Sequence, residues 1–232
     1  MKGKVASIAL SVVLIASVGW ASPLTDYSQG KVSVDVISRP DLSMGDGTLN
    51  GDGKSDNMAY DLTVGLGHKW AIQYQHDSID SKSMGIYGYS GSLQGKAEAV
   101  NVLYKLDKNV AAFAGWTKAT ADISGSDLST AGITVDVSKI NGYQAGFVGT
   151  LPLQKNLTAF STVGFGNKIT NYELGMAYQL DKNLEFNVGY RYTKYKGNET
   201  VSYSSSYGSY IIDSGTDNFT IKGMECGITY KF

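Results

Sequence analysis

Apolar and polar residues alternate along the last stretch of the chain, from Phe219 to Phe232. Counted backwards from the last residue, the alternate positions are apolar: Phe232, Tyr230, Ile228, Cys226 and Met224. The positions between them are polar or small: Lys231, Thr229, Gly227, Glu225 and Gly223. Because successive side chains of a strand point to opposite faces, this spacing predicts a strand with one apolar and one polar face.

The same alternation recurs in nine earlier segments, at residues 31–36, 60–67, 70–75, 100–106, 110–116, 143–151, 157–165, 172–180 and 184–192. With room for extension at their ends, they approach the roughly 9–11 residues that a tilted membrane-spanning strand requires. The pattern predicts an all-β protein of about ten antiparallel strands. Eight strands remain an alternative if two of these segments belong to loops.

Short polar turns alternate with long polar links between the predicted strands. The turns at 106–110, 153–157 and 180–184 are near copies of one another, and 66–70 is a looser fourth. The long links cover 38–57, 80–95, 121–141 and 197–217, whereas 166–169 is short. This asymmetry is typical of up-and-down transmembrane β-barrels, whose short turns face the periplasm and whose long loops face the outside.

The first residues have the pattern of a secretory signal peptide. Lys2 and Lys4 precede an apolar run over 5–18, and the small residues Gly19 and Ala21 occupy the −3 and −1 positions of the predicted cleavage site. We therefore predict a signal peptide at 1–21 and a single β-domain at 22–232. No later segment has the roughly twenty apolar residues of a membrane helix, so a membrane-spanning domain would have to be a closed barrel.

Composition supports this class and excludes others. The chain has 28 Gly and 16 Tyr but only 3 Pro, which suits a β-domain. Cys226 is the only cysteine, so the chain has no internal disulfide. A net charge of −1 argues against a nucleic-acid partner.

The polar faces of the predicted strands would line the lumen. The candidate lumen residues are Asp35, Asp61, Gln73, Gln75, Gln144, Glu173, Glu185, Asn187, Arg191 and Glu225. Two alternatives follow for a barrel of this size. Inward glycines remove bulk and leave a narrow channel that prefers cations, or Arg191 pairs with Glu173 or Glu185 in an ion-pair network that closes the barrel.

A stretch at residues 46–56 resembles the calcium loops of EF-hand-like repeats. Asn50, Asp52 and Asp56 match three ligand positions, and Gly53 matches the glycine of the sharp turn. The first acidic ligand and the bidentate Glu are missing, because Thr48 and Ala59 stand in their places. The stretch is either a calcium site or a solvated Asp- and Gly-rich loop. No other cofactor is expected.

Two further features bear on function. His76 and Asp77 are adjacent, but neighbours on a strand point to opposite faces, so we expect no catalytic pair and no enzyme. The segments 84–92 and 202–214 are rich in Tyr, Ser and Gly, a composition typical of recognition surfaces. They are either a surface for an extracellular ligand or polar loops.

Export signal, alternation and a final aromatic strand together resemble small bacterial outer-membrane β-barrel proteins of the OmpA-like and porin-like group. The resemblance implies a bacterial outer-membrane location, surrounding outer-membrane lipid, and assembly by the outer-membrane insertion machinery. It also implies that Tyr230 and Phe232 form the assembly signal. We expect a structural, surface-exposed barrel that presents its loops. A narrow, weakly cation-preferring channel is the alternative, and an outer-membrane hydrolase with a site at the rim is a distant one.

Overall fold

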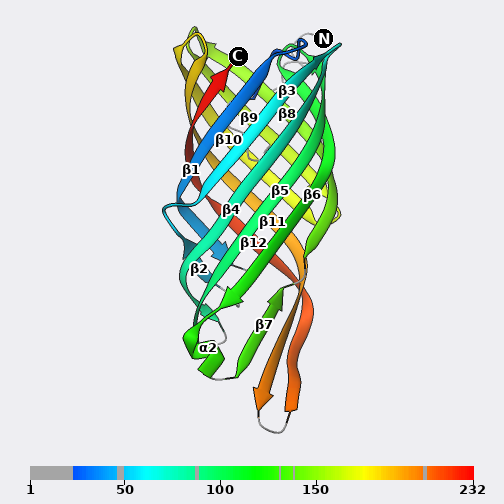
Figure 1. The fold of residues 1–232 in the computed structure, drawn as a ribbon. Helices are drawn as coiled ribbons and strands as arrows, with labels where there is room; N and C mark the ends of the chain where they lie inside the picture. The colour runs from blue at the N-terminus through cyan, green and yellow to red at the C-terminus, as the bar shows by residue number, and fades with distance from the viewer. Residues whose placement is uncertain (1–22, 46–49, 87–88, 131, 138, 206–207) are drawn as a thin grey trace, which may run out of the picture.

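The computed structural model describes residues 23–45, 50–86, 89–130, 132–137, 139–205 and 208–232. Ten antiparallel strands of this part form a ring (Figure 1): β1 (Val32–Gly45), β3 (Met58–Gly67), β4 (Trp70–Ile86), β5 (Tyr89–Asp107), β6 (Val110–Ser124), β8 (Ile140–Gln154), β9 (Leu157–Gly166), β10 (Ile169–Asp181), β11 (Leu184–Ser205) and β12 (Gly208–Lys231). Each pairs with the next, and β12 closes the ring on β1, from Ser33 opposite Lys231 to Gly45 opposite Thr220. The predicted barrel is confirmed, with ten ring strands rather than eight.

The four predicted short turns all join neighbouring strands at the end where both termini lie (Figure 1). In the turn between β3 and β4, His68 and Lys69 have φ angles of 50° and 73°. Two consecutive residues with positive φ match the hairpin turn whose twist fits the flanking strands. The looser fourth copy is therefore also a tight hairpin.

The long polar links are mostly strands, which corrects the prediction of loops. The β11–β12 ladder continues to Ser205 opposite Gly208, and the β4–β5 ladder to Ile86 opposite Tyr89. Outside the ring, β2 (Asn50–Gly53) pairs with β1 and β4, β7 (Ile133–Val137) pairs with β11, and the short helix α2 covers Ser126–Thr130. Apart from the alternation of Ile133, Val135 and Val137, these links are mostly polar in sequence and give no period-two apolar signal. Pairing between the strands still satisfies their backbone groups.

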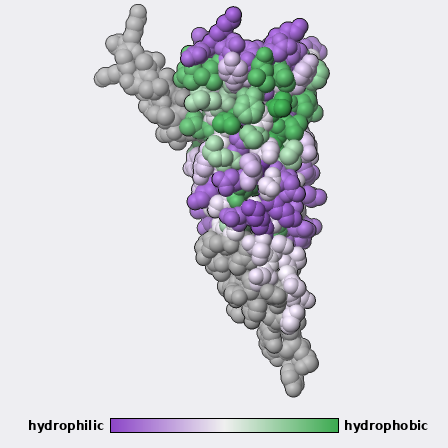
Figure 2. Space-filling model, turned by 90° about the vertical axis from the view of Figure 1, so that its left-hand side faces the viewer, coloured by the Kyte–Doolittle hydropathy of each residue, from purple (hydrophilic) through white to green (hydrophobic). Residues whose placement is uncertain are grey.

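The strands extend well beyond the membrane-facing part of the barrel. At about 3.3 Å per residue, the 22 residues of β11 span about 70 Å, whereas the apolar band of a membrane barrel is about 25 Å tall. Figure 2 shows this band as a green zone near the end with the termini, followed by a hydrophilic zone. The rest of each long strand therefore extends beyond the membrane, on the side away from the termini.

The distribution of polar and apolar residues is the reverse of that in a water-soluble protein. Exposed apolar side chains form the outer band, among them Val34, Leu62, Ile72, Val102, Leu174, Val188 and Ile228. Buried side chains of the inner face include Asp35, Asp61, Gln73, Asn101 and Glu173. Within the described ranges, no helix is long and apolar enough to cross a membrane. An apolar outer surface around a polar interior fits a barrel surrounded by lipid.

In the sequence, Lys96 and Glu98 fall on the apolar parity of β5, which predicts a bulge or a later start of this strand. Its ladder with β6 instead runs without a shift from Ser92 to Lys105. Lys96 and Glu98 do face outward, but they lie past Val100, where the exposed apolar run of this strand ends. Outward charges beyond the band meet water and headgroups, so the strand needs no bulge.

Candidate functional site

The interior of the barrel is built in three layers. At the end with the termini, an apolar cluster contains Leu24, Tyr27, Ala71, Leu103, Ala111, Phe113 and Val148. Toward the long hairpins, a second apolar cluster contains Leu42, Met44, Ile79, Leu93, Ala97, Ala119, Ile169, Tyr195 and Ile221. Charged and amide side chains fill the space between them. We take this middle layer as the candidate functional site, because an ion or solute that crosses the lumen would have to pass between its side chains.

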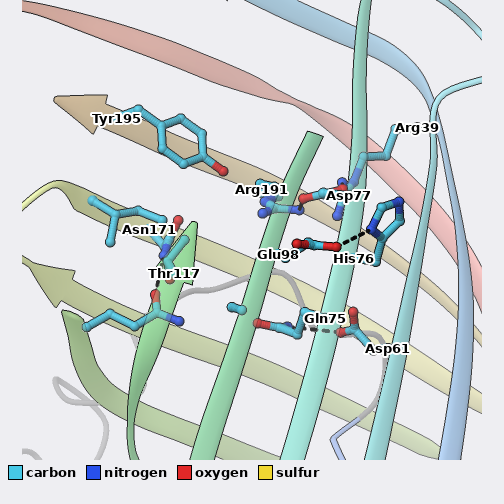
Figure 3. A pocket seen from close by; sticks show the side chains of 14 residues that line it. Arg39, Asp61, Gln75, His76, Asp77, Glu98, Thr117, Asn171, Arg191 and Tyr195 are labelled. Atoms are coloured by element: carbon cyan, nitrogen blue, oxygen red, sulfur yellow. Dashed lines mark hydrogen bonds and ion pairs between the residues drawn. The ribbon is translucent and has the colours of Figure 1, made fainter. Parts of the chain in front are cut away.

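Four charged side chains, which we call the charged belt, cross the middle layer: Arg39, Asp77, Arg191 and Glu225. Arg39 on β1 forms an ion pair with Asp77 on β4, and its Nε donates to Glu225 Oε2 on β12 at 3.1 Å. Arg191 Nη1 on β11 lies 2.8 Å from Asp77 Oδ2. Figure 3 shows Arg39 and Arg191 converging on Asp77. Because β12, β1 and β3 separate β11 from β4 in the ring, the belt bridges the lumen.

Sequence reasoning missed two members of this belt. Arg39 falls in a segment expected to be a loop, and Asp77 follows the last alternation assigned to its strand. Both could have been found by extending the inward-facing positions of each strand in steps of two residues. The step after Asp35 and Ile37 is Arg39, and the step after Gln75 is Asp77. The expected partners of Arg191 were wrong as well. Arg191 pairs with Asp77 rather than with Glu173 or Glu185.

A chain of amide side chains continues the polar layer around the ring. Gln75 donates to Asp61 at 3.0 Å, and Asn101 donates to Gln75 at 3.2 Å. Gln144 donates to Asn101 at 2.9 Å, and Asn171 donates to Gln144 at 3.1 Å. These side chains come from β3, β4, β5, β8 and β10. Hydrogen bonds between buried amides hold the side chains in place, so the layer is a connected network.

Inward glycines were expected to free space in the lumen, but aromatic rings occupy that space. A Cβ added to Gly146 would lie 2.8 Å from a ring carbon of Phe113, its partner across the β6–β8 ladder. A Cβ on Gly175 would lie 2.8 Å from a ring carbon of Phe160, its partner across the β9–β10 ladder. Each ring covers the glycine opposite, a known arrangement of cross-strand pairs. At these two positions, the glycines therefore make room for aromatic side chains.

Residues 23–31, which we call the N-terminal segment, pack into the mouth of the barrel. Leu24 and Tyr27 are each only 4% exposed. The backbone of Tyr27 accepts a hydrogen bond from Gly67 N at 2.9 Å, and Lys105 Nζ donates to the Thr25 carbonyl at 2.5 Å. Outside the membrane-spanning strands, burial raises the pKa of the Tyr27 phenol. The segment closes the apolar layer at this end.

Three small cavities are lined by residues that the structure describes. The one at the charged belt has a volume of about 30 Å³, and the two others have about 20 and 10 Å³. A water molecule needs about 10–15 Å³ of such space. Each of these three cavities can therefore hold a few waters at most.

The structure places the predicted lumen residues on the inner side. Asp35, Asp61, Gln73, Gln144, Glu173, Asn187, Arg191 and Glu225 are buried there, and Gln75 is half-buried. Glu185 lies nearer the termini, where its Oε1 is 2.7 Å from Lys231 Nζ. At the end of β12, the rings of Tyr230 and Phe232 stack edge to face, 4.7 Å apart. Both side chains are exposed on the outer face, and their role in assembly stays a prediction.

The two other candidate sites have different outcomes. His76 faces outward, with Nδ1 3.7 Å from Glu98, whereas Asp77 lies in the charged belt, so the two do not pair.

Residues 50–53 form strand β2, and Asp52 and Asp56 are exposed. The described residues hold no group of three or more His, Cys, Asp or Glu side chains placed to bind a metal ion. Residues 46–49 lie outside the described ranges, so calcium binding by Asn50, Asp52 and Asp56 stays a prediction. Residues 1–21, the predicted signal peptide, also lie outside them.

Comparison with known proteins supports the outer-membrane character of the chain. No protein-family model matches the sequence. The outer membrane protein Omp-EA of Erwinia amylovora is 28% identical over 192 residues, which are 78% of this chain and 43% of the relative. The chain thus spans less than half the length of that relative.

A solved structure has the same fold. The outer membrane protease OmpT of Escherichia coli superposes with a TM-score of 0.56 at 12% identity, over 87% of this chain and 97% of that chain. OprG of Pseudomonas aeruginosa is a more distant match, with a TM-score of 0.47 at 13% identity, over 90% and 99%. The closed ring, its outward apolar band and the similarity to Omp-EA identify the chain as a bacterial outer-membrane β-barrel protein.

Proposed function

We propose that the protein is a closed, structural barrel that displays its long hairpins at the cell surface and does not conduct ions. The observation that carries this proposal is the charged belt. Arg191 on β11 and Arg39 on β1 both reach Asp77 on β4, and Glu225 on β12 holds Arg39. A permeating ion would have to displace these side chains from one another.

Opening the belt would be energetically costly. Separating one member of a buried ion pair from its partner costs about 3–5 kcal/mol, because an uncompensated charge is left behind. The N-terminal segment and the apolar layer around Tyr27 close the lumen a second time toward the periplasm. Two independent closures in series favour a scaffold over the alternative of a narrow cation channel.

In such a scaffold, the part of the barrel beyond the apolar band would be the part that meets extracellular ligands. The β11–β12 hairpin continues as a paired ladder to Ser205 and Gly208, and β7 adds a strand to it. A paired ladder holds its backbone in a defined shape, which lowers the ordering cost of binding. This extension is therefore suited to present a surface to an extracellular ligand.

Planar-bilayer recording of the refolded residues 22–232 tests the proposal. Folding is verified beforehand by heat-modifiable migration on a gel. We expect an electrically silent barrel from the unsubstituted protein. Discrete cation-preferring steps from the unsubstituted protein would overturn the proposal. In that case, Asp61→Asn and Glu173→Asn should alter the ion selectivity of the channel.

A further inference from the structure

Two carboxylates lie side by side on the inner wall of the barrel, between the charged belt and the end with the termini. Asp35 on β1 is directly opposite Asp61 on β3 in the ladder, and the two residues are only 3% and 4% exposed. We call them the aspartate pair. Side chains directly opposite on one face of a sheet have Cβ atoms about 4.5–5.5 Å apart, and like charges in this arrangement are destabilising. The pair therefore needs a positive charge nearby.

The basic side chains around the aspartate pair are engaged by other acids. Lys231 is the diagonal neighbour of Asp35 across the β1–β12 ladder, but its Nζ lies 2.7 Å from Glu185 Oε1. Arg39, four residues after Asp35 on the same face, is held by two members of the charged belt. Among the ion pairs of the described residues, none includes the aspartate pair. The two charges are therefore not neutralised by these basic side chains.

Hydrogen bonds satisfy the aspartate pair only in part. Gln75 Nε2 donates to Asp61 Oδ2 at 3.0 Å, as Figure 3 shows, and Ser33 Oγ donates to Asp35 Oδ2 at 3.4 Å. The other oxygen of Asp35, Oδ1, is buried and has no hydrogen-bond partner within the described part of the chain. Buried polar atoms in native structures are almost always hydrogen-bonded, so a buried carboxylate oxygen without a partner points to a bound water or ion. Asp35 thus offers an unused ligand atom beside a second carboxylate.

Three hydroxyl side chains add further oxygen atoms around the aspartate pair. Thr229 on β12 lies opposite Asp35, and Thr63 on β3 lies opposite Ser33. All three hydroxyl residues are on the inner face and at most 2% exposed. Hard cations such as calcium prefer oxygen ligands of this kind, with carboxylates supplying the charge. The chemistry of the surroundings therefore suits a cation rather than an apolar or anionic ligand.

Apolar side chains separate the aspartate pair from the charged belt. Ile37 and Ala59 lie opposite each other, one inward position further along β1 and β3, and each is 1% exposed. Toward the periplasm, the N-terminal segment and the apolar layer around Tyr27 close the lumen. A cation bound to the pair would have to pass one of these closures to leave, so we expect it to exchange slowly with the solvent.

We propose that the aspartate pair binds a divalent cation inside the barrel, with calcium as the probe that tests it. One divalent ion neutralises both carboxylates, provides a partner for Asp35 Oδ1 and ends the repulsion across the ladder. Because the pair supplies only two carboxylates, hydroxyl oxygens and water complete the shell of about six to eight ligands that calcium takes. The ion links β1 to β3 beside the seam where β12 closes the ring. This site is separate from the candidate calcium loop at 46–56.

The metal content of the refolded barrel tests this site. Residues 22–232 are refolded in micelles with calcium, passed through gel filtration in a chelator, and analysed by inductively coupled plasma mass spectrometry. The chelator removes ions from exposed sites, whereas an ion behind the two closures stays bound. We expect about one calcium ion per unsubstituted barrel, and almost none in the test variant, Asp35→Asn with Asp61→Asn. The matched control, Asp52→Asn with Asp56→Asn, removes two exposed carboxylates of the candidate loop and should keep its ion.

Thermal stability gives a second measurement of the same site. An ion that binds only the folded barrel stabilises it, so the temperature of the heat-modifiable gel transition should be higher after refolding in calcium than in chelator. The control variant should keep this shift and the test variant should lose it. Asp35→Asn alone replaces the double variant if heat-modifiable migration shows that the latter does not fold. The proposal is overturned if the unsubstituted barrel retains no calcium, as expected when the two carboxylates share a proton instead, or if the test variant retains as much calcium as the control.

Discussion

Replacing Arg39 with methionine tests whether the charged belt is a buried network or a set of weak ion pairs. Methionine replaces the unbranched stem of the arginine as far as Nε but removes the guanidinium, with its charge and its donors. Arg39 and Glu225 side chains are 3% and 4% exposed, and Arg39 also holds Asp77. The substitution leaves Glu225 without its arginine and leaves Asp77 with Arg191 alone.

The expected cost follows from this burial. Breaking a buried ion pair by removing one partner costs about 3–5 kcal/mol. The outer-face pair of Lys54 and Asp80 is the matched control, because its atoms are 3.9 Å apart and its side chains 40% and 35% exposed. Lys54→Met should therefore cost about 0–1 kcal/mol. The difference between the losses of unfolding free energy in the two variants shows how much more a buried ion pair contributes than an exposed one.

Equilibrium urea unfolding of the refolded barrel in micelles, followed by tryptophan fluorescence, measures both values. With a slope of about 2 kcal/mol per molar urea, Arg39→Met should lower the midpoint by about 2 M. A double-mutant cycle with Asp77→Asn should give a coupling free energy of about 0.5–3 kcal/mol. If Arg39→Met and Lys54→Met lower the midpoint equally, or the cycle shows no coupling, the belt does not hold the lumen closed as argued.

Three further predictions concern the ends of the barrel. Gly65→Val should displace the N-terminal segment, since a Cβ there would lie 2.9 Å from the Tyr27 carbonyl carbon, and protease should then cleave 23–31 faster. Gly149→Ala, whose Cβ would meet nothing closer than 3.6 Å, is its control, and equal cleavage would contradict the reasoning. Phe232→Ala should reduce the amount of folded barrel in cells several-fold, by heat-modifiable gel shift, while refolding of the purified protein stays unchanged; normal assembly would exclude Phe232 from the signal. Calcium should protect the loop at 46–56 from protease if it is a metal site, and the same cleavage pattern with a chelator would remove that prediction.

The sequence determined which side chains face lipid and which face the lumen. In a strand this assignment is local, because side chains alternate with a period of two whatever the rest of the chain does. This rule alone assigns Val34 and Val188 to the lipid-facing side, and Asp35 and Asn187 to the lumen. The hairpin turns are local as well, so the order of strands around the ring followed from the chain.

Only the tertiary structure decided which inner side chains meet. Arg191 and Asp77 are far apart in the sequence and on strands that are not neighbours, so their contact depends on closure of the ring and on the tilt of its strands. The same holds for the gathering of Tyr27 and Phe113 in one apolar cluster. The long hairpins also needed the structure, because their sequences are mostly polar and leave little periodic apolar signal. Alternation sorts residues between two faces, but partners across a lumen are fixed by the geometry of the closed barrel.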